Sequence, residues 1–580
     1  MYTDIPSVMI LISLMKQFNI RHVVASPGTR NTALVHSIEN DDFFKVYSVV
    51  DERSAGFVAL GMAEELDAPV CVTCTAATAT CNYAPAIKEA YERGIQLVAL
   101  TADQNAYSMF HMEDQCIDQR NMYDGYIKYA VDVPRVESED DYWFCNRCIN
   151  EAFLALNHNG KGPVQINYHM DYGLDRLAEA PNSQLPVTRK INRYVENTCN
   201  WNEMAECLNE KQKILVIGGS NYNVDDSLSK QLRMFFEKYN AVIVCDHFAN
   251  EREDYVLNPV GIGDVWWSQI EQYQPDYIIT FGNIFYSTIK YGIGNGEHTK
   301  HWHIAIDGTV NDGFRKLENV FEMSPENFFT NINKFGKENN KTYYNIWKQG
   351  LDNIKYPDLK FTNFNAMKHL TEVIPDNSIV HMSVLDSIRL TNYCKLNNSI
   401  KCFANIGADG IDGALSAFMG QARETDALSF LIIGDLSMMY DMNALLNEIT
   451  PNIRIFVINN YAGAEFHKNF GLDKIETLND FIAAGHNTRM KQISIMNQFE
   501  YLCADNEKEL NDSLAKFVVN DGKAKILEVI TDADIDAKTL KEYWKINTIE
   551  QPTTIKSVIK KNVKKILGRR MINAIKAFRG

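Results

Sequence analysis

The stretch FLIIGDLSMMYDMNALLNEITPNIRIFVINN, residues 430–460, contains two apolar runs that each end in a polar pair. The first run ends at Gly434-Asp435 and the second at Asn459-Asn460, with a helical pattern between them. Two β-rich runs joined by a helix predict a parallel βαβ unit. The polar pairs then lie at the carboxyl ends of neighbouring strands, which is where α/β sheets bind their ligands.

The same stretch carries the chemistry of a metal–phosphate site. Gly434 allows a ligand to approach the backbone, and the helix after Asp435 offers N-terminal amides to a phosphate. A carboxylate from Asp435, an amide oxygen from Asn460, a backbone carbonyl and phosphate oxygens are natural ligands of Mg²⁺. Taken alone, a Gly-Asp pair after a strand is more often just a turn.

The whole chain repeats this alternation of strands and helices in three segments, 1–180, 190–335 and 358–548. We therefore predict an α/β protein with three parallel-sheet domains. The Gly-rich turn of the middle segment lacks the spacing of a dinucleotide site, so we expect that domain to be mainly architectural.

The totals narrow the class of protein. A net charge of −16 over 580 residues argues against a nucleic-acid binder. No apolar run is long enough to span a membrane, and the 12 cysteines form no disulfide framework, which favours the cytoplasm.

The last segment, residues 551–580, reverses the charge of the chain, with nine Lys or Arg and no acid. Its apolar residues recur at helical spacing, which predicts a basic amphipathic helix. Such a helix binds the anionic inner face of a membrane, or docks on the protein with its basic face in solvent.

A second stretch, VVDERSAGFVALGMAEEL at residues 49–66, places Glu52 between the end of a strand and the start of a helix. An acidic residue there is favourable for the helix dipole, which is sufficient reason for Glu52 if this stretch is taken alone. Together with Asp435 and Asn460, however, the chain resembles the thiamine diphosphate (ThDP) enzymes, whose pattern is GD, about 25 residues and then N or NN.

The resemblance is closest to the family of 2-succinyl-5-enolpyruvyl-6-hydroxy-3-cyclohexene-1-carboxylate (SEPHCHC) synthases of menaquinone biosynthesis. It rests on the motifs SPGTRNTAL, DERSAGFVALGMAE, CTAATATCNYAPAIKEA, LTAD, GADGIDGALS, GDLSMMYDMNALL and VINNYAGAEF, in family order. They cover the first and third segments, and the three-domain layout fits the chain to about residue 548.

The resemblance implies roles for individual residues. Glu52 would hydrogen-bond the aminopyrimidine of ThDP, and Ile411 would force its bent conformation. Asp435, Asn460 and the Ala462 carbonyl would hold Mg²⁺ or Mn²⁺. The implied cofactor-binding set is Glu52, Thr78, Gly410, Ile411, Gly434, Asp435, Leu436, Ser437 and Asn460, and the implied catalytic set is Glu52, Gln115 and Ile411.

The implied substrate residues are Arg30, Gln104, Asp114, Gln115, Lys290, Ser383 and Arg389. Arg30 would meet a substrate carboxylate, for which a guanidinium is well suited. Ser383 and Arg389 resemble the Ser/Arg pair that binds the donor's distal carboxylate, with a spacing longer by two residues. Lys290 stands where the middle domain contributes a basic residue.

Several positions depart from the family pattern. TAATA, residues 75–79, replaces TSGTA, and Gln104 and Ile406 each replace an arginine. Asp114 replaces an asparagine. These changes remove positive charge from the acceptor site, so we expect an acceptor other than the dicarboxylate isochorismate.

We therefore predict a ThDP-dependent enzyme that decarboxylates a 2-oxo acid and transfers the acyl-anion unit to an unidentified acceptor. The donor is 2-oxoglutarate if Arg389 binds a distal carboxylate. The alternatives are a simple 2-oxo acid decarboxylase and a non-catalytic, membrane-associated scaffold. The resemblance also implies a homodimer, or a dimer of dimers, in which Glu52 and Asp435 of one site come from different chains.

Overall fold

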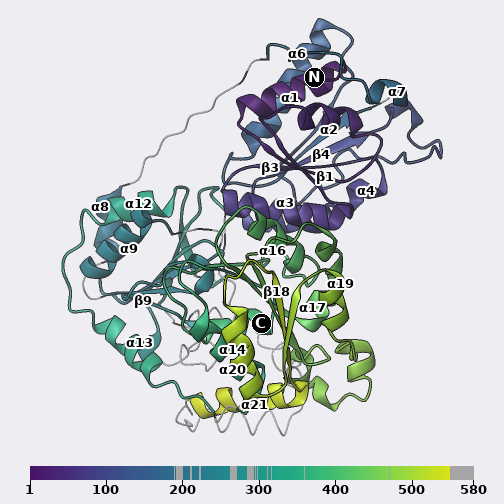
Figure 1. Cartoon of the computed structure of the whole chain (residues 1–580). Helices are drawn as coiled ribbons and strands as arrows, with labels where there is room; N and C mark the ends of the chain where they lie inside the picture. The colour runs from purple at the N-terminus through teal and green to yellow at the C-terminus, as the bar shows by residue number, and fades with distance from the viewer. Residues whose placement is uncertain are drawn as a thin grey trace, which may run out of the picture.

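A computed structural model describes residues 1–170, 172–188, 190, 200–208, 212–220, 222, 224–260, 271–283, 293, 296, 298–309, 311, 313–314, 316–357, 360–468 and 471–548. Lys290 and the basic segment 551–580 lie outside these residues. The described chain forms three six-stranded sheets in which every strand pair is parallel, so the predicted α/β class is confirmed (Figure 1).

The first sheet has the strand order β2-β1-β3-β4-β6-β5. Its strands are β1 (His22–Ala25), β2 (Lys45–Ser48), β3 (Val70–Cys74), β4 (Leu97–Asp103), β5 (Tyr129–Val133) and β6 (Val164–His169). Its helices include α1 (Pro6–Gln17), α2 (Thr32–Glu39), α3 (Glu52–Leu66), α4 (Thr78–Cys81), α5 (Ala84–Arg93), α6 (Glu139–Ala155) and α7 (Leu174–Leu177). The two central strands β3 and β4 are fully buried, as expected for parallel strands covered on both faces.

The second sheet has the order β12-β11-β10-β7-β8-β9. Its strands are β7 (Ile214–Gly218), β8 (Ala241–Cys245), β9 (Val256–Leu257), β10 (Tyr277–Phe281), β11 (Lys300–Ile304) and β12 (Leu317–Phe321). The described helices around it include α8 (Trp201–Cys207), α9 (Asp226–Lys238), α12 (Pro325–Ile332) and α13 (Thr342–Asp352).

The third sheet has the order β14-β13-β15-β16-β18-β17. Its strands are β13 (Ile379–Met382), β14 (Lys401–Ala404), β15 (Ser429–Gly434), β16 (Ile453–Asn459), β17 (Glu500–Ala504) and β18 (Lys525–Ile530). Its helices include α14 (Asn363–Val373), α15 (Asp386–Asn392), α16 (Ala414–Arg423), α17 (Asp435–Tyr440), α18 (Glu465–Lys468), α19 (Lys491–Met496), α20 (Glu507–Phe517) and α21 (Ala533–Asn547). The stretch 430–460 thus contains β15, α17 and β16, and the strands β15 and β16 pair in parallel as predicted.

The second and third domains share one apolar core and a buried histidine contact. His247 follows β8, and its Nε2 lies 3.2 Å from the Thr391 carbonyl and 3.0 Å from the Cys394 carbonyl. Arg252 Nε donates to Nδ1, so the ring is neutral with its proton on Nε2. Burial accordingly lowers the pKa of His247 to about 3.

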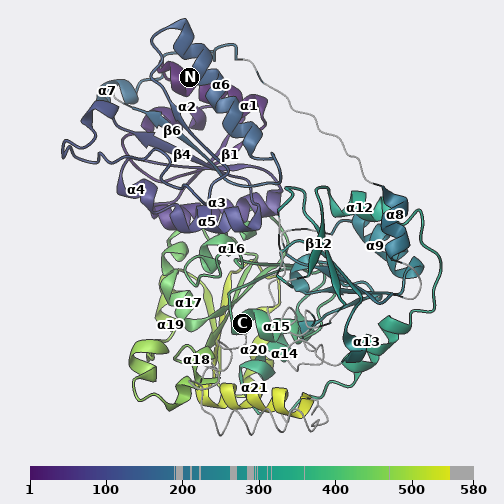
Figure 2. The ribbon, with the colours of Figure 1, turned by 180° about the vertical axis from the view of Figure 1, so that it is seen from behind.

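The first domain meets the third through α3, which lies across α16 in both opposite views (Figures 1 and 2). Two CxxC pairs, Cys71/Cys74 and Cys145/Cys148, consist of buried free thiols. Among the described residues, no helix combines the length and apolarity needed to cross a membrane.

Candidate active site

Asp435 lies at the carboxyl end of β15 and is the first residue of α17. Its side chain is almost fully buried, and its two oxygens accept the backbone N–H groups of Leu436 (2.7 Å) and Tyr461 (2.8 Å). His486 Nε2 lies 3.2 Å from Oδ2. The Tyr461 contact ties the end of β15 to the end of β16, so Asp435 and Asn460 come to the same edge of the sheet.

This edge fits a divalent cation. Burial raises the pKa of Asp435, since the carboxylate has lost water without gaining a full opposite charge. Asn460 lies at the same edge of the sheet, where its Nδ2 donates to Asp536. Ala462 follows two residues later. A cation would compensate the buried carboxylate, and amide and carbonyl oxygens would complete the oxygen ligands that Mg²⁺ prefers.

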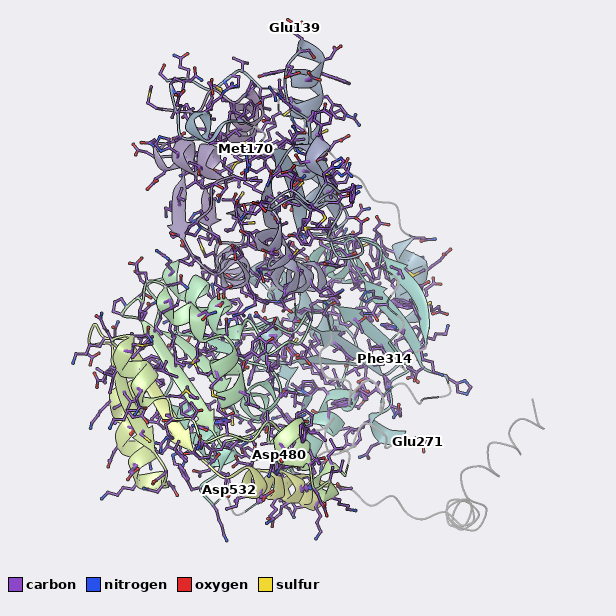
Figure 3. The ribbon with its side chains drawn as sticks, turned by 90° about the vertical axis from the view of Figure 1, so that its right-hand side faces the viewer. Glu139, Met170, Glu271, Phe314, Asp480 and Asp532 are labelled. Atoms are coloured by element: carbon purple, nitrogen blue, oxygen red, sulfur yellow. The ribbon has the colours of Figure 1, made fainter. Side chains whose placement is uncertain are left out.

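A pocket of about 660 Å³ opens beside these residues. Its lining includes Asn460, Tyr461 and Ala462 together with Asp480 and Asp532, which lie at the same end of the third domain in Figure 3. A Cβ at Gly434 would meet nothing within 4 Å, so the backbone beside Asp435 also faces open space. Asn460 and Ala462 therefore border the pocket, and Gly434 borders open space.

A chain of hydroxyl groups links α17 to the turn before α16. Ser383 Oγ donates to Ser437 Oγ (2.9 Å), and Ser437 Oγ donates to the Ile411 carbonyl (2.9 Å). Ser383 is buried here and serves this chain. Ile411 keeps 36% of its surface exposed, which is unusual for an isoleucine and leaves an apolar side chain available to a ligand.

The N-terminus of α3 is anchored to the same turn. Asp51 caps α3 through the amides of Arg53 and Ser54, and its Oδ2 accepts Asn443 Nδ2 at 2.7 Å. Arg53 donates to the Asp412 carbonyl and to Asp441 Oδ1. Glu52, between these two anchors, is half-buried and is thereby held at the boundary of the first and third domains.

Asp441 is the buried centre of this junction. Its side chain is fully buried and accepts both the hydroxyl and the backbone N–H of Ser416, each at 2.7 Å. Burial raises its pKa to about 6, against the lowering effect of the Ser416 bonds and of Arg53. Neither Arg53 nor Asp441 was singled out from the sequence, although both lie inside the motifs that carry the resemblance.

The packing of α3 on α16 depends on two glycines. A methyl group at Gly61 would overlap the backbone carbonyl of Ala417, and one at Gly420 would overlap that of Val58. Each helix therefore places a glycine against the backbone of the other, which allows a very close approach. The Glu52 half and the Asp435 half of the site come together because of this contact.

Ala77 of the turn TAATA has a backbone conformation that favours glycine. Its φ is 68°, and its amide donates to Gln119 Oε1 at 2.6 Å. Thr78, the next residue, is exposed at the start of α4. Alanine is therefore strained at position 77, where the family pattern has glycine.

The predicted substrate residues of the first domain lie together. Arg30 donates to the Met170 carbonyl (2.8 Å) and to Gln104 Oε1 (3.5 Å), and Gln104 Nε2 donates to the Asp114 carbonyl. Gln115 follows in an exposed loop with φ 53°. The side chain that stands in place of an arginine, Gln104, is thus a neutral bridge between Arg30 and this loop.

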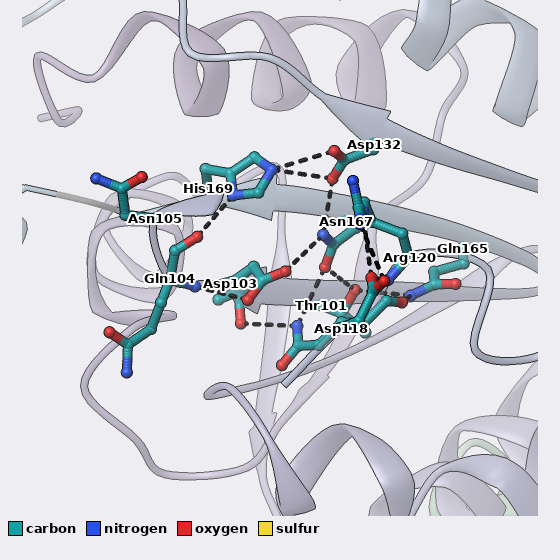
Figure 4. A network of polar contacts seen from close by, with 12 residues as sticks. Thr101, Asp103, Gln104, Asn105, Asp118, Arg120, Asp132, Gln165, Asn167 and His169 are labelled. Atoms are coloured by element: carbon teal, nitrogen blue, oxygen red, sulfur yellow. Dashed lines mark hydrogen bonds and ion pairs between the residues drawn. The ribbon is translucent and has the colours of Figure 1, made fainter. Parts of the chain in front are cut away.

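Behind Gln104 lies a polar network that sequence reasoning missed (Figure 4). Asn167 donates from Nδ2 to Asp103 (2.9 Å) and to Asp132 (2.8 Å), and His169 lies 3.0 Å from Asp132. Burial alone would lower the pKa of His169, but its bonds to Asp132 and to the Gln104 carbonyl raise it to about 9. The charge of His169 is thereby matched by a carboxylate of the chain.

On the third domain, Arg389 contacts carboxylates of the chain, Glu465 and Asp386. Lys290 lies outside the described residues. The roles inferred for Glu52, Gln115, Asp435, Asn460 and the other site residues stay predictions.

Comparison with known proteins agrees with this geometry. Residues 8–122 match the family described as the thiamine pyrophosphate enzyme, N-terminal TPP binding domain. The chain is 32% identical to SEPHCHC synthases of Phocaeicola vulgatus and Bacteroides thetaiotaomicron and 30% identical to that of Flavobacterium psychrophilum. Each match covers 94% of this chain and 99% of the relative.

The chain belongs to the SEPHCHC synthase family. It is therefore a ThDP-dependent enzyme of the SEPHCHC synthase type, and the predicted family is confirmed.

We expect Gly61→Ala to weaken ThDP binding about tenfold or more, or about 1.4 kcal/mol, because the added methyl group pushes α3 away from α16. Calorimetric titration with ThDP and Mg²⁺ measures the effect. Gly522→Ala is the control: its φ is 79°, so alanine is strained there, but nothing lies within 4 Å of the added carbon. A Gly61→Ala protein with wild-type affinity would show that the close approach is not needed.

Proposed function

We propose that the chain is a ThDP- and Mg²⁺-dependent carboligase, which decarboxylates a 2-oxo acid and transfers the acyl-anion unit to an acceptor. The observation that carries the proposal is the α3–α16 contact. This contact brings the helix that starts at Glu52 against the turn of Ile411 and Asp412. The Ile411 carbonyl in turn accepts a hydrogen bond from Ser437 of α17, the helix that begins at Asp435.

In such a reaction, different residues of the chain would bind the metal ion, hold a proton and contact the cofactor. Asp435, Asn460 and the Ala462 carbonyl would hold the metal ion, and Glu52 would hold a proton at the aminopyrimidine. ThDP, when bound, supplies the electron sink for decarboxylation. Ile411 presents its apolar side chain to the cofactor, and the Asp51 and Arg53 anchors keep Glu52 oriented.

The acceptor would approach from the first domain, where Arg30 meets Gln104. Arg30 can bind one carboxylate, whereas Gln104 and the matched pair of His169 and Asp132 add no net positive charge. This balance supports an acceptor that carries less negative charge than a dicarboxylate.

The first test is CO₂ release from a panel of 2-oxo acids with ThDP and Mg²⁺. We expect release that Glu52→Gln lowers about a hundredfold or more, because the substitution removes the proton-holding carboxyl group. Glu39→Gln, an exposed change at the end of α2 in the same domain, should have no effect. Absence of release from every acid, with the protein folded and ThDP bound, would contradict the proposal.

We also propose a homodimer with sites shared between chains, as the resemblance implies. In the structure the α3–α16 contact lies within one chain, and the same contact made between two chains would produce two equivalent shared sites.

Mixing two inactive variants, Glu52→Gln and Asp435→Ala, separates these arrangements. A shared site predicts recovery of up to about a quarter of wild-type activity, since half of the dimers are mixed and each has one intact site. Sites built within one chain predict no recovery. The control is mixing either variant with itself under the same refolding or co-expression conditions.

A further inference from the structure

Four charged side chains form a compact cluster beside the candidate site. Arg389 and Asp386 lie on α15, and Glu465 and Lys468 lie on α18, which begins four residues after Tyr461. Arg389 is bound to Glu465 by two parallel contacts, Nη1 to Oε2 at 2.7 Å and Nη2 to Oε1 at 3.2 Å. Its Nη1 also donates to Asp386 Oδ1 at 2.8 Å.

The four side chains together carry two positive and two negative charges. Lys468 pairs with Asp386 and, at 2.9 Å, with Glu465, so both cations contact both carboxylates. The side chains are 19% (Arg389), 19% (Asp386), 11% (Glu465) and 1% (Lys468) exposed. Burial alone would raise the pKa of Asp386, but Lys468 and Arg389 lower it, in keeping with ionised partners.

The cluster borders the region expected to hold the reacting groups. The pKa of Asp409 is raised to about 6, chiefly by burial and then by the negative charges of Glu89 and Glu465. Asp409 immediately precedes the Gly410-Ile411 turn, and Tyr461 donates to Asp435 just before α18 begins. Glu465 therefore lies close to residues that flank both Ile411 and Asp435.

The other well-buried cation at this edge is also matched. Arg53, 16% exposed, is paired with Asp441. Arg53, Arg389 and Lys468, each with less than a fifth of the side chain exposed, all face carboxylates of the chain. A second carboxylate of a substrate would add an unmatched negative charge to a largely buried, neutral cluster, which is costly.

We infer that Glu465 occupies the position that a donor's distal carboxylate would take at Arg389, and that the donor is a 2-oxo acid with a single carboxylate and an uncharged far end. The inference rests on the proposed function and specifies its substrate class. Glu465 is then a specificity-determining residue, because its carboxylate consumes the bidentate capacity of Arg389.

The matched test pair is 2-oxovalerate and 2-oxoglutarate, which have the same number of carbons and differ at the far end. We expect wild-type kcat/KM, measured by CO₂ release, to favour 2-oxovalerate at least about tenfold. Glu465→Gln gives Arg389 and Lys468 an unmatched positive charge, so the preference should shift toward 2-oxoglutarate at least about tenfold. Glu448→Gln, which breaks the exposed pair with Arg423, should leave the preference unchanged.

Binding without turnover gives a second measurement. Butyrylphosphonate and succinylphosphonate mimic the two acids and lose no CO₂, so calorimetry with the ThDP-loaded protein reports the far-end preference directly. The same order of affinities, and the same shift in Glu465→Gln, would support the inference even in a variant with low activity.

The outcomes separate the two proposals. A wild-type protein that prefers 2-oxoglutarate overturns the donor class, and a preference that Glu465→Gln leaves unchanged overturns the role of Glu465. In both cases the carboligase function stands. A protein that releases CO₂ from no 2-oxo acid and binds neither phosphonate overturns the proposed function, and the inference with it.

Discussion

The contact between α3 and α16 is the constraint on which the site depends. Gly61 and Gly420 bring two helices from different domains to backbone contact, a distance that any larger residue would prevent. At that distance Arg53 reaches the Asp412 carbonyl and Asp441, so the N-terminus of α3 is fixed beside the turn of Ile411. The position of Glu52 relative to Asp435 follows from this packing.

Several charged side chains near the candidate site are paired with opposite charges of the same chain. Asp441 has Arg53, His169 has Asp132, and Arg389 has Glu465 and Asp386. Asp435 is the contrast, because burial raises its pKa and its Oδ2 faces the ring of His486, at 3.2 Å, in place of an arginine or lysine. A buried carboxylate in deficit suits a metal ion, whereas balanced pairs suit neutral parts of a substrate. Under the proposed function, this difference would let one edge of the sheet bind a metal cation and select an uncharged substrate end.

The interior strands of each sheet can be predicted from the sequence, whereas several outer strands cannot. The runs that form β3, β4, β7, β8, β15 and β16 are largely apolar and buried, as expected for strands covered on both faces. The strands β5, β9, β12 and β17 all lie at sheet edges, where partly exposed side chains give no continuous apolar run.

The site showed the same division. Glu52, Asp435 and Asn460 follow strands directly, so their position at a sheet edge could be predicted. Glu465 stands in a quoted motif, yet its partner Arg389 is 76 residues away and only the fold brings the two together. His169 and Asp132 meet across β6 and β5, and β5 is an edge strand with no continuous apolar run. Pairings between distant segments determine the substrate side, and local patterns do not encode them.

The central claim is that Glu52 acts on a cofactor held at the Asp435 edge. The rate of deuterium exchange at the thiazolium C2 of protein-bound ThDP, followed by acid quench and NMR, tests it before any substrate is known. The account predicts faster exchange than in free ThDP and a loss of about a hundredfold or more in Glu52→Gln. Exchange at the free-cofactor rate in the wild-type protein, or an equal rate in the bound Glu52→Gln variant, would contradict it.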